Sequence, residues 1–154
     1  NTVYNPLKYY NYLVGHNSRL DEVQAALLRI KLPLLDSYIN ARRERAAVYN
    51  KALQSTSLVL PVEGEGVHHT YYLYMVQSEN REAVIKKLSD AGIATGVYYP
   101  IPIHLQKCYN NLGYKLGSLP NAEYLSHRTF AIPMFPEMTA EEQAYVIETL
   151  QTGE

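Results

Sequence analysis

The chain has a single cysteine and almost no net charge, and each of these features excludes a class of protein. Its one cysteine, Cys108, excludes an internal disulfide and a cysteine-rich metal cluster, as is typical of cytoplasmic proteins, and we interpret it as a buried thiol. The 14 basic and 15 acidic side chains nearly cancel, so we expect no broad surface for nucleic acid. No apolar run approaches the roughly 18 residues that a membrane span needs. These shortages indicate a cytoplasmic protein with neither nucleic acid nor a membrane as a partner.

Tyrosine is abundant, with 15 residues against 2 phenylalanines and no tryptophan. A tyrosine ring packs like an apolar group while its hydroxyl needs a partner, so the cluster Tyr71, Tyr72 and Tyr74 favours core or interface packing over a binding site. His68 and His69 precede this cluster. Neighbouring side chains of an extended segment point to opposite faces, and no third ligand follows at a fitting spacing, so we expect no metal site.

The first part of the chain has the pattern of a long, kinked helical arm. Ser18 and Asp21 resemble an N-terminal capping box with Ser18 as the cap, and apolar residues then recur at helical spacing, at positions 23, 26, 27, 30 and 34. Pro33 interrupts the pattern, which predicts a kink and a second helix over residues 35–53. Such an arm is too long for one small domain to cover, so we expect half of it to pack against another domain or subunit.

The rest of the chain alternates short strands with helices and predicts an α+β fold. Strands are expected at residues 58–60, 70–76, 95–98 and 130–133, and helices at 79–91, at 122–129 and after Thr139. Gly92 follows the first of these helices as a stop signal, and Thr139 with Glu142 forms a capping-box pattern before the last. We therefore expect a small, mostly antiparallel sheet of three to four strands with helices on one side.

Three separated segments carry a combined pattern. They are residues 15–26 (GHNSRLDEVQAA) with 31–36 (KLPLLD), residues 92–95 (GIAT) with 98–106 (YYPIPIHLQ), and residues 112–114 (LGY), 120–123 (PNAE) and 131–136 (AIPMFP). Together they resemble the DegT/StrS-type family of nucleotide-sugar aminotransferases that use pyridoxal 5'-phosphate. The resemblance covers nearly the whole chain and is closest to the branch that aminates the 3-position of the sugar.

The resemblance implies a carboxyl-terminal small domain of a fold-type I aminotransferase that works as a homodimer. The implied reaction transfers an amino group from glutamate to a nucleotide-linked keto-6-deoxy sugar, 3-keto in particular, for amino-sugar biosynthesis. In this family the catalytic lysine lies upstream of the segment that begins here at Gly15, so we expect it before Asn1 and expect this chain alone to be inactive. We divide the chain into a linking segment (1–20), a helical arm (21–54) and a small α+β domain (55–154).

Two candidate residues lie just before the predicted arm. Asn17 and Arg19 stand where free backbone N–H groups and the helix dipole favour an anion. An amide and a guanidinium there can bind phosphate oxygens, although the residues alone favour an ordinary capping loop. The resemblance implies that Asn17 reaches the cofactor phosphate across the dimer and that Arg19 contacts the phosphate of the cofactor or of the substrate.

Three further candidates lie at the proline-rich loop. His104 follows Pro100 and Pro102, which stiffen the loop, and the resemblance implies that it contacts the substrate; the alternative is an exposed histidine without a role. Tyr98 and Tyr99 end the preceding strand and offer hydroxyls to a sugar, with core packing as the alternative. Because relatives often carry histidine at the position of Tyr98, Tyr99 is the stronger candidate.

One different class of protein fits the same pattern of helices and strands. A non-enzymatic α+β module could use the helical arm to dimerise or to bind a regulatory partner. Such a module needs neither a cofactor nor a sugar substrate.

Overall fold

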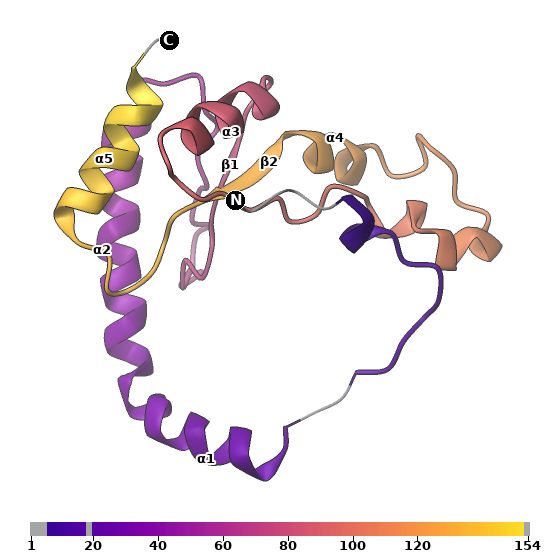
Figure 1. The fold of residues 1–154 in the computed structure, drawn as a ribbon, viewed down its shortest axis with the longest axis horizontal. Helices are drawn as coiled ribbons and strands as arrows, with labels where there is room; N and C mark the ends of the chain where they lie inside the picture. The colour runs from indigo at the N-terminus through magenta and orange to yellow at the C-terminus, as the bar shows by residue number, and fades with distance from the viewer. Residues whose placement is uncertain (1–5, 18–19, 153–154) are drawn as a thin grey trace.

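The computed structural model describes residues 6–17 and 20–152. Its elements confirm the expected α+β class (Figure 1). In chain order they are η1 (Pro6–Tyr9), α1 (Glu22–Lys31), η2 (Leu32–Leu34), α2 (Leu35–Leu53), β1 (Tyr74–Gln77), α3 (Arg81–Asp90), η3 (Ile103–Leu105), η4 (Lys107–Leu112), α4 (Pro120–Arg128), β2 (Thr129–Ile132) and α5 (Ala140–Gln151). We call α2, β1, α3, β2 and α5 together the helix–sheet core.

The sheet is antiparallel and brings two apolar strand faces together. Tyr74 pairs with Ile132 and Val76 with Phe130, and all four side chains are buried. Partners that lie directly opposite in an antiparallel pair share one face, so these side chains form a continuous apolar surface. Regular pairing in the described chain is confined to β1 and β2, because the expected outer strands contribute only single bridges, Val59 to Gln77 and Gly96 to Ala131.

Helices α2 and α5 lie side by side and close the core (Figure 1). Tyr49 of α2 is fully buried, and its hydroxyl donates to the carbonyl of Pro133 at 3.0 Å, which satisfies the polar group that burial would otherwise leave without a partner. The predicted capping box opens α5: the Thr139 hydroxyl accepts from the Glu142 N–H at 3.1 Å, and the Glu142 carboxylate accepts from the Thr139 N–H at 2.8 Å.

The helical arm is kinked at Pro33 as expected, because η2 interrupts the α-helical bonding between α1 and α2. The start of α1 differs from the prediction. Asp21 is the N-cap, with its carboxylate accepting from the Gln24 N–H at 2.7 Å, whereas Ser18 lies outside the described residues. Helix α1 buries none of its residues and extends away from the helix–sheet core (Figure 1).

The strand expected from residue 70 begins four residues later, at Tyr74. Tyr71 has a φ of 46°, which bends the chain out of the extended conformation. Arg42 and Arg43 of α2 hold the segment just before it, donating to the carbonyls of Thr70 at 3.1 Å and His69 at 2.7 Å. These contacts tie residues 69–70 to α2 instead of to a sheet partner.

Helix α3 ends where the sequence indicates. Gly92 has a φ of 76° and its N–H donates to the carbonyl of Ser89 at 2.9 Å, so the chain leaves the helix through a left-handed residue. Among the helices of the described residues, none combines the length and the hydropathy that crossing a membrane requires.

Candidate functional site

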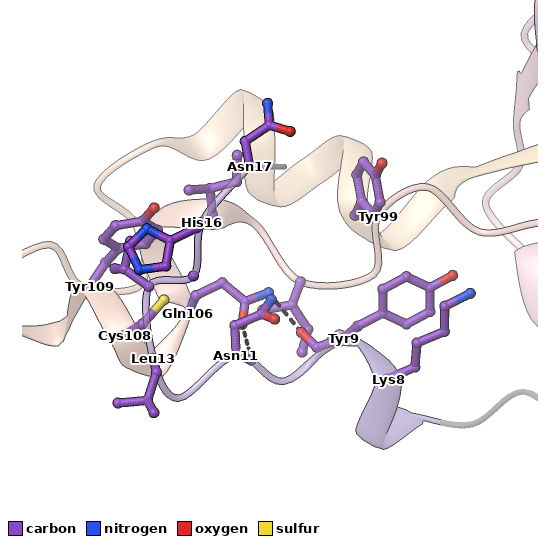
Figure 2. Close-up of a pocket in the computed structure, with 14 residues that line it drawn as sticks. Lys8, Tyr9, Asn11, Leu13, His16, Asn17, Tyr99, Gln106, Cys108 and Tyr109 are labelled. Carbon is purple, nitrogen blue, oxygen red and sulfur yellow. Dashed lines mark hydrogen bonds between the residues drawn. The ribbon is translucent and has the colours of Figure 1, made fainter. Parts of the chain in front are cut away.

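A cavity of about 740 Å³ lies where the segment before α1 meets the proline-rich loop. Figure 2 shows Lys8, Tyr9 and Tyr99 at one end of it and His16 and Tyr109 at the other. Its described lining residues include one lysine and one histidine but no aspartate or glutamate, so the lining favours an anion. They are Lys8, Tyr9, Asn11, Leu13, Val14, Gly15, His16, Asn17, Tyr99, Ile101, Ile103, Gln106, Cys108 and Tyr109.

Gln106 holds the two walls of the cavity together. Its side-chain amide donates to the carbonyl of Tyr9 at 2.8 Å and its oxygen accepts from the N–H of Asn11 at 3.0 Å (Figure 2). The N–H of Cys108 donates back to the carbonyl of Asn11 at 3.0 Å. Gln106 is only 8% exposed, so these bonds are partly shielded from water and fix residues 9–11 against the loop.

Aromatic rings line the end of the cavity near Lys8. The rings of Tyr9 and Tyr99 meet edge to face with centroids 6.1 Å apart, and the ammonium of Lys8 lies 5.6 Å from the centroid of Tyr9. Tyr99 remains 64% exposed, so its hydroxyl is open to a ligand. This end of the cavity therefore combines a cation with a polar aromatic surface.

The structure brings together two of the five predicted site residues. Asn17 and Tyr99 both line the cavity, and their side chains lie along the same side of it (Figure 2). Arg19 lies outside the described residues. Tyr98 instead borders a separate hollow of about 160 Å³ beside Ala122 and Thr129, with its ring packed over Gly96.

His104 is not among the residues that line the cavity. Its side chain is 4% exposed, and its Nε2 lies 2.9 Å from the carboxylate of Glu123 in α4. The ring of Tyr114 meets that of His104 edge to face, with centroids 6.1 Å apart. The alternative of an exposed histidine is therefore wrong, and the contact with substrate that the resemblance implies stays a prediction.

Glu123 receives several hydrogen bonds in addition to that of His104. The N–H of Gly117 lies 2.9 Å from both carboxylate oxygens, and the N–H of Leu119 lies 3.3 Å from one of them. The bond from Gly117 lowers the pKa of Glu123 below its usual value, and those from His104 and Leu119 act in the same direction against the opposing effect of burial.

Two cavity residues were missed by the sequence reasoning. Neither Lys8 nor Gln106 is among the predicted site residues, and Gln106 enters the prediction only as the last residue of the motif at residues 98–106. Their significance depends on contacts between residues far apart in the chain, which no local pattern reveals. Cys108, expected to be buried, is instead half-buried at the cavity.

One of the two adjacent histidines, His69, has a structural use. Its Nδ1 accepts from the N–H of Tyr71 at 2.8 Å, and the rings of His69 and Tyr71 meet at a tilt, with centroids 4.2 Å apart. In the part of the chain that the structure describes, no group of three or more His, Cys, Asp or Glu side chains is arranged to hold a metal ion.

Comparison with known proteins identifies relatives over most of the chain. A 43% identical relative, over 93% of this chain, is the "Pleiotropic regulatory protein" of Geobacillus stearothermophilus. A second, 42% identical over 89% of this chain, is the dTDP-3-amino-3,4,6-trideoxy-alpha-D-glucose transaminase of Micromonospora megalomicea subsp. nigra. The solved structure of DesV from S. venezuelae superposes with a TM-score of 0.81 at 35% identity, over 94% of this chain.

The match covers most of this chain but only a smaller share of each relative. The chain spans 39%, 38% and 39% of the lengths of these three proteins, respectively. The profile of the DegT/DnrJ/EryC1/StrS aminotransferase family matches residues 4–151. The chain therefore belongs to the DegT/DnrJ/EryC1/StrS aminotransferase family.

Proposed function

We propose that the complete polypeptide containing this chain is an aminotransferase that transfers an amino group from glutamate to a nucleotide-linked keto-6-deoxy sugar, in its 3-keto form. Family membership supports the reaction class, and the 42% identical Micromonospora relative, named as a 3-amino-sugar transaminase, supports the substrate class. One structural observation carries the proposal further: Asn17 and Tyr99, from two separate motifs, line one cavity.

The cavity has the size and chemistry of a site for a phosphorylated ligand. Its volume of about 740 Å³ lies within the about 300–1,000 Å³ typical of small-molecule sites. The Asn17 amide and the Lys8 ammonium are donors that suit phosphate oxygens, and the described lining holds no carboxylate to repel them. These residues fit the phosphate of pyridoxal 5'-phosphate or the diphosphate of a nucleotide sugar.

Pyridoxal phosphate, when bound, supplies an electron sink and carries the amine. Asn17 would hold its phosphate, with Arg19 beside it or on the substrate phosphate. The Tyr99 hydroxyl would bind the sugar, and Tyr98, which borders the separate hollow, is the weaker candidate for such a contact. Direct contact between His104 and the substrate stays a prediction of the resemblance.

We further propose that the site is completed in a homodimer. Helix α1 presents Val23, Leu27 and Ile30 at 71%, 58% and 72% exposure, which is an apolar face that this chain does not cover. We expect the chain by itself to lack transaminase activity, because the resemblance assigns the catalytic lysine to a segment before Asn1. Lys8, the lysine at the described cavity, belongs to a different segment of the family pattern.

The test is an assay of the complete protein with glutamate, pyridoxal phosphate and nucleotide-linked 3-keto or 4-keto sugars. We expect 2-oxoglutarate and an amino sugar to form with the 3-keto substrate. Asn17→Ala should weaken cofactor affinity about tenfold, the loss expected for a hydrogen bond to a charged group. Tyr99→Phe should raise the KM for the sugar, while Tyr72→Phe, at a 76% exposed position outside the cavity, serves as the control. Absence of 2-oxoglutarate with both sugars would exclude this function.

A second candidate is a dimerising regulatory module. The 43% identical Geobacillus relative carries the name of a pleiotropic regulatory protein, and the uncovered face of α1 offers a contact surface. This alternative predicts a complete protein that consumes no glutamate but dimerises, with Leu27→Glu breaking the dimer. Sedimentation of the parent protein and of Leu27→Glu tests the dimer, which both functions expect, and the transaminase assay separates the two functions.

A further inference from the structure

The carboxylate of Glu123 joins the start of α4 and the turn directly before it to η3, which lies 19 positions earlier in the chain. It accepts from the N–H groups of Gly117 and Leu119, which holds the turn before α4, and it pairs with the ring of His104 in η3. The Glu123 side chain is 12% exposed and that of His104 is 4% exposed. Gly117 has a φ of 89°, a conformation that suits glycine, and this turns its N–H toward the carboxylate.

A short series of contacts connects this cluster to the cavity. His104 lies in the single turn of η3, between two residues of the cavity lining, Ile103 and Gln106. The N–H of Gln106 donates to the carbonyl of Ile103 at 3.0 Å, so this turn fixes the positions of the three residues relative to one another. The side chain of Gln106 then holds the opposite wall through Tyr9 and Asn11.

We propose that Glu123 and His104 are positioning residues, which fix η3 so that Ile103 and Gln106 form the wall of the ligand cavity. In this proposal the pair acts through Gln106, whereas the resemblance implies that His104 contacts the substrate directly; neither His104 nor Glu123 is among the described residues that line the cavity. This inference rests on the proposed function only for the identity of the ligand, a nucleotide-linked sugar. It also gives a role to the motif residue Glu123, which the predicted site does not use.

A positioning role and a merely structural role predict different results. If the pair is merely structural, its loss lowers the free energy of global unfolding, and the cavity wall opens more often only because the whole chain unfolds more often. A positioning pair loosens the cavity wall while the rest of the fold stays closed. The two cases are separated by a probe in the wall that reports local opening under native conditions.

Cys108 is that probe, because it is the only cysteine of the chain and lines the cavity. Its N–H is bonded to the carbonyl of Asn11, so its surroundings change when the two walls separate. The measurement is the rate at which 5,5'-dithiobis(2-nitrobenzoate) labels Cys108 in the folded chain. Urea unfolding of each variant corrects for global stability.

We expect Glu123→Ala and His104→Ala each to raise the labelling rate about tenfold, a factor that corresponds to about 1.4 kcal/mol. The double variant should label no faster than the faster of the two single variants, because each single variant already removes the contact between His104 and Glu123. Glu123→Gln should label at a rate between those of Glu123→Ala and the parent, because its amide oxygen can replace Oε1 as the acceptor for His104, Gly117 and Leu119, whereas its NH2 group cannot accept from Gly117 in place of Oε2. The matched control is Glu79→Ala, which breaks the surface ion pair with Arg128 (2.8 Å) outside the cavity lining.

The inference is overturned if folded Glu123→Ala and His104→Ala label at rates within about twofold of the parent rate. It is also overturned if their labelling rates rise no more than that of a variant with a substitution in the helix–sheet core and the same loss of stability. If an alanine variant loses its cooperative unfolding transition, Glu123→Asp replaces it under the same criterion, because it keeps the charge but shortens the reach.

The complete protein gives a second readout. If the proposed transaminase activity is present, Glu123→Ala should raise the KM for the nucleotide sugar about tenfold and leave kcat within about twofold, since the reacting groups are untouched. An unchanged KM would count against the positioning role. If the parent protein has no transaminase activity, the proposed function fails while the labelling result still decides the positioning role.

Discussion

The helix–sheet core and the cavity wall are held by different interactions. In the core, apolar side chains such as Tyr49, Tyr74 and Phe130 are completely buried between α2, α5 and the two strands. Along the cavity lining, the buried side chain is a polar one, Gln106, and many of the others are exposed. The core is therefore stabilised mainly by apolar burial, whereas the wall depends on a few directed hydrogen bonds.

This difference separates what a substitution does in each region. Loss of an apolar side chain in the core leaves a void and lowers the stability of the whole fold. Loss of a hydrogen bond in the wall costs less and acts locally, because many of the neighbouring residues are already open to water. The variants below test that separation.

The largest effect is expected for Phe130→Ala in β2. Phe130 is completely buried opposite Val76, and removing its ring should cost about 3–5 kcal/mol of unfolding free energy. Urea denaturation followed by circular dichroism measures this loss. Tyr72→Ala, at a 76% exposed position, is the control and should change stability by less than about 0.5 kcal/mol. A loss for Phe130→Ala as small as that of the control would break the comparison.

A smaller effect is expected for Gly96→Ala, where the core meets the proline-rich loop. A Cβ at Gly96 would lie 2.5 Å from Cε2 of Tyr98, so the ring must move, at a cost of about 1–3 kcal/mol. Gly15→Ala, with no atom within 4 Å of its Cβ, should be nearly neutral in the same urea titration. Adding Tyr98→Ala should recover much of the loss if the ring causes it.

The third test concerns the wall itself. Gln106→Ala removes the acceptor of the Asn11 N–H, which should speed hydrogen exchange at that amide about fivefold, the factor that corresponds to about 1 kcal/mol. Two-dimensional NMR exchange measurements report it residue by residue. Gln151→Ala, which removes a comparable bond to the carbonyl of Ala52 (2.8 Å), should leave Asn11 unchanged. Equal acceleration in both variants would contradict a local effect.

The smallest effect on stability is expected from the ion pair between Arg43 of α2 and Glu63, whose charged atoms lie 2.7 Å apart. The hydrogen bond from Arg43 lowers the pKa of Glu63 from 4.5 to about 2, and the N–H of His69 acts in the same direction. The Glu63 carboxylate therefore binds a proton less readily in the folded state than in the unfolded chain. The contribution of its ion pair with Arg43 to stability is fully present above pH 4.5. It is lost as the pH falls from 4.5 toward 2.

Urea unfolding of the parent and of Glu63→Gln at several pH values checks this prediction. The difference in unfolding free energy between the two should be greatest near neutral pH and should narrow in acid. In an Arg43→Gln background the narrowing should be much weaker, because the main cause of the shifted pKa is gone. A difference that widens in acid would show the sign to be wrong.

Local signals predicted much of the fold. Thr139 and Glu142 mark the start of α5, and Gly92 marks the end of α3, because each depends on residues a few positions apart. The start of α1 was misplaced because Ser18 and Asp21 are both good N-caps and the sequence does not choose between them. The strand at residue 70 was drawn too long because contacts from α2 redirect the chain.

The candidate site was predictable only in part. The motifs supplied Asn17 and Tyr99, but the amide of Gln106 that brings their segments together acts over 95 positions. The partner of His104, Glu123, belongs to a separate motif with no spacing rule that links the two. Side chains that act over such separations are found through the tertiary structure.

The reach of Gln106 also has a consequence for how the protein is made. Its backbone partners Asn11 and Tyr9 lie 95 and 97 positions earlier in the chain. Closing so long a loop costs more entropy than forming a hairpin or a helix, so we expect this contact to form after the local structure during folding. During synthesis on the ribosome, the wall formed by residues 9–11 therefore cannot pair with Gln106 until the proline-rich loop has been synthesised.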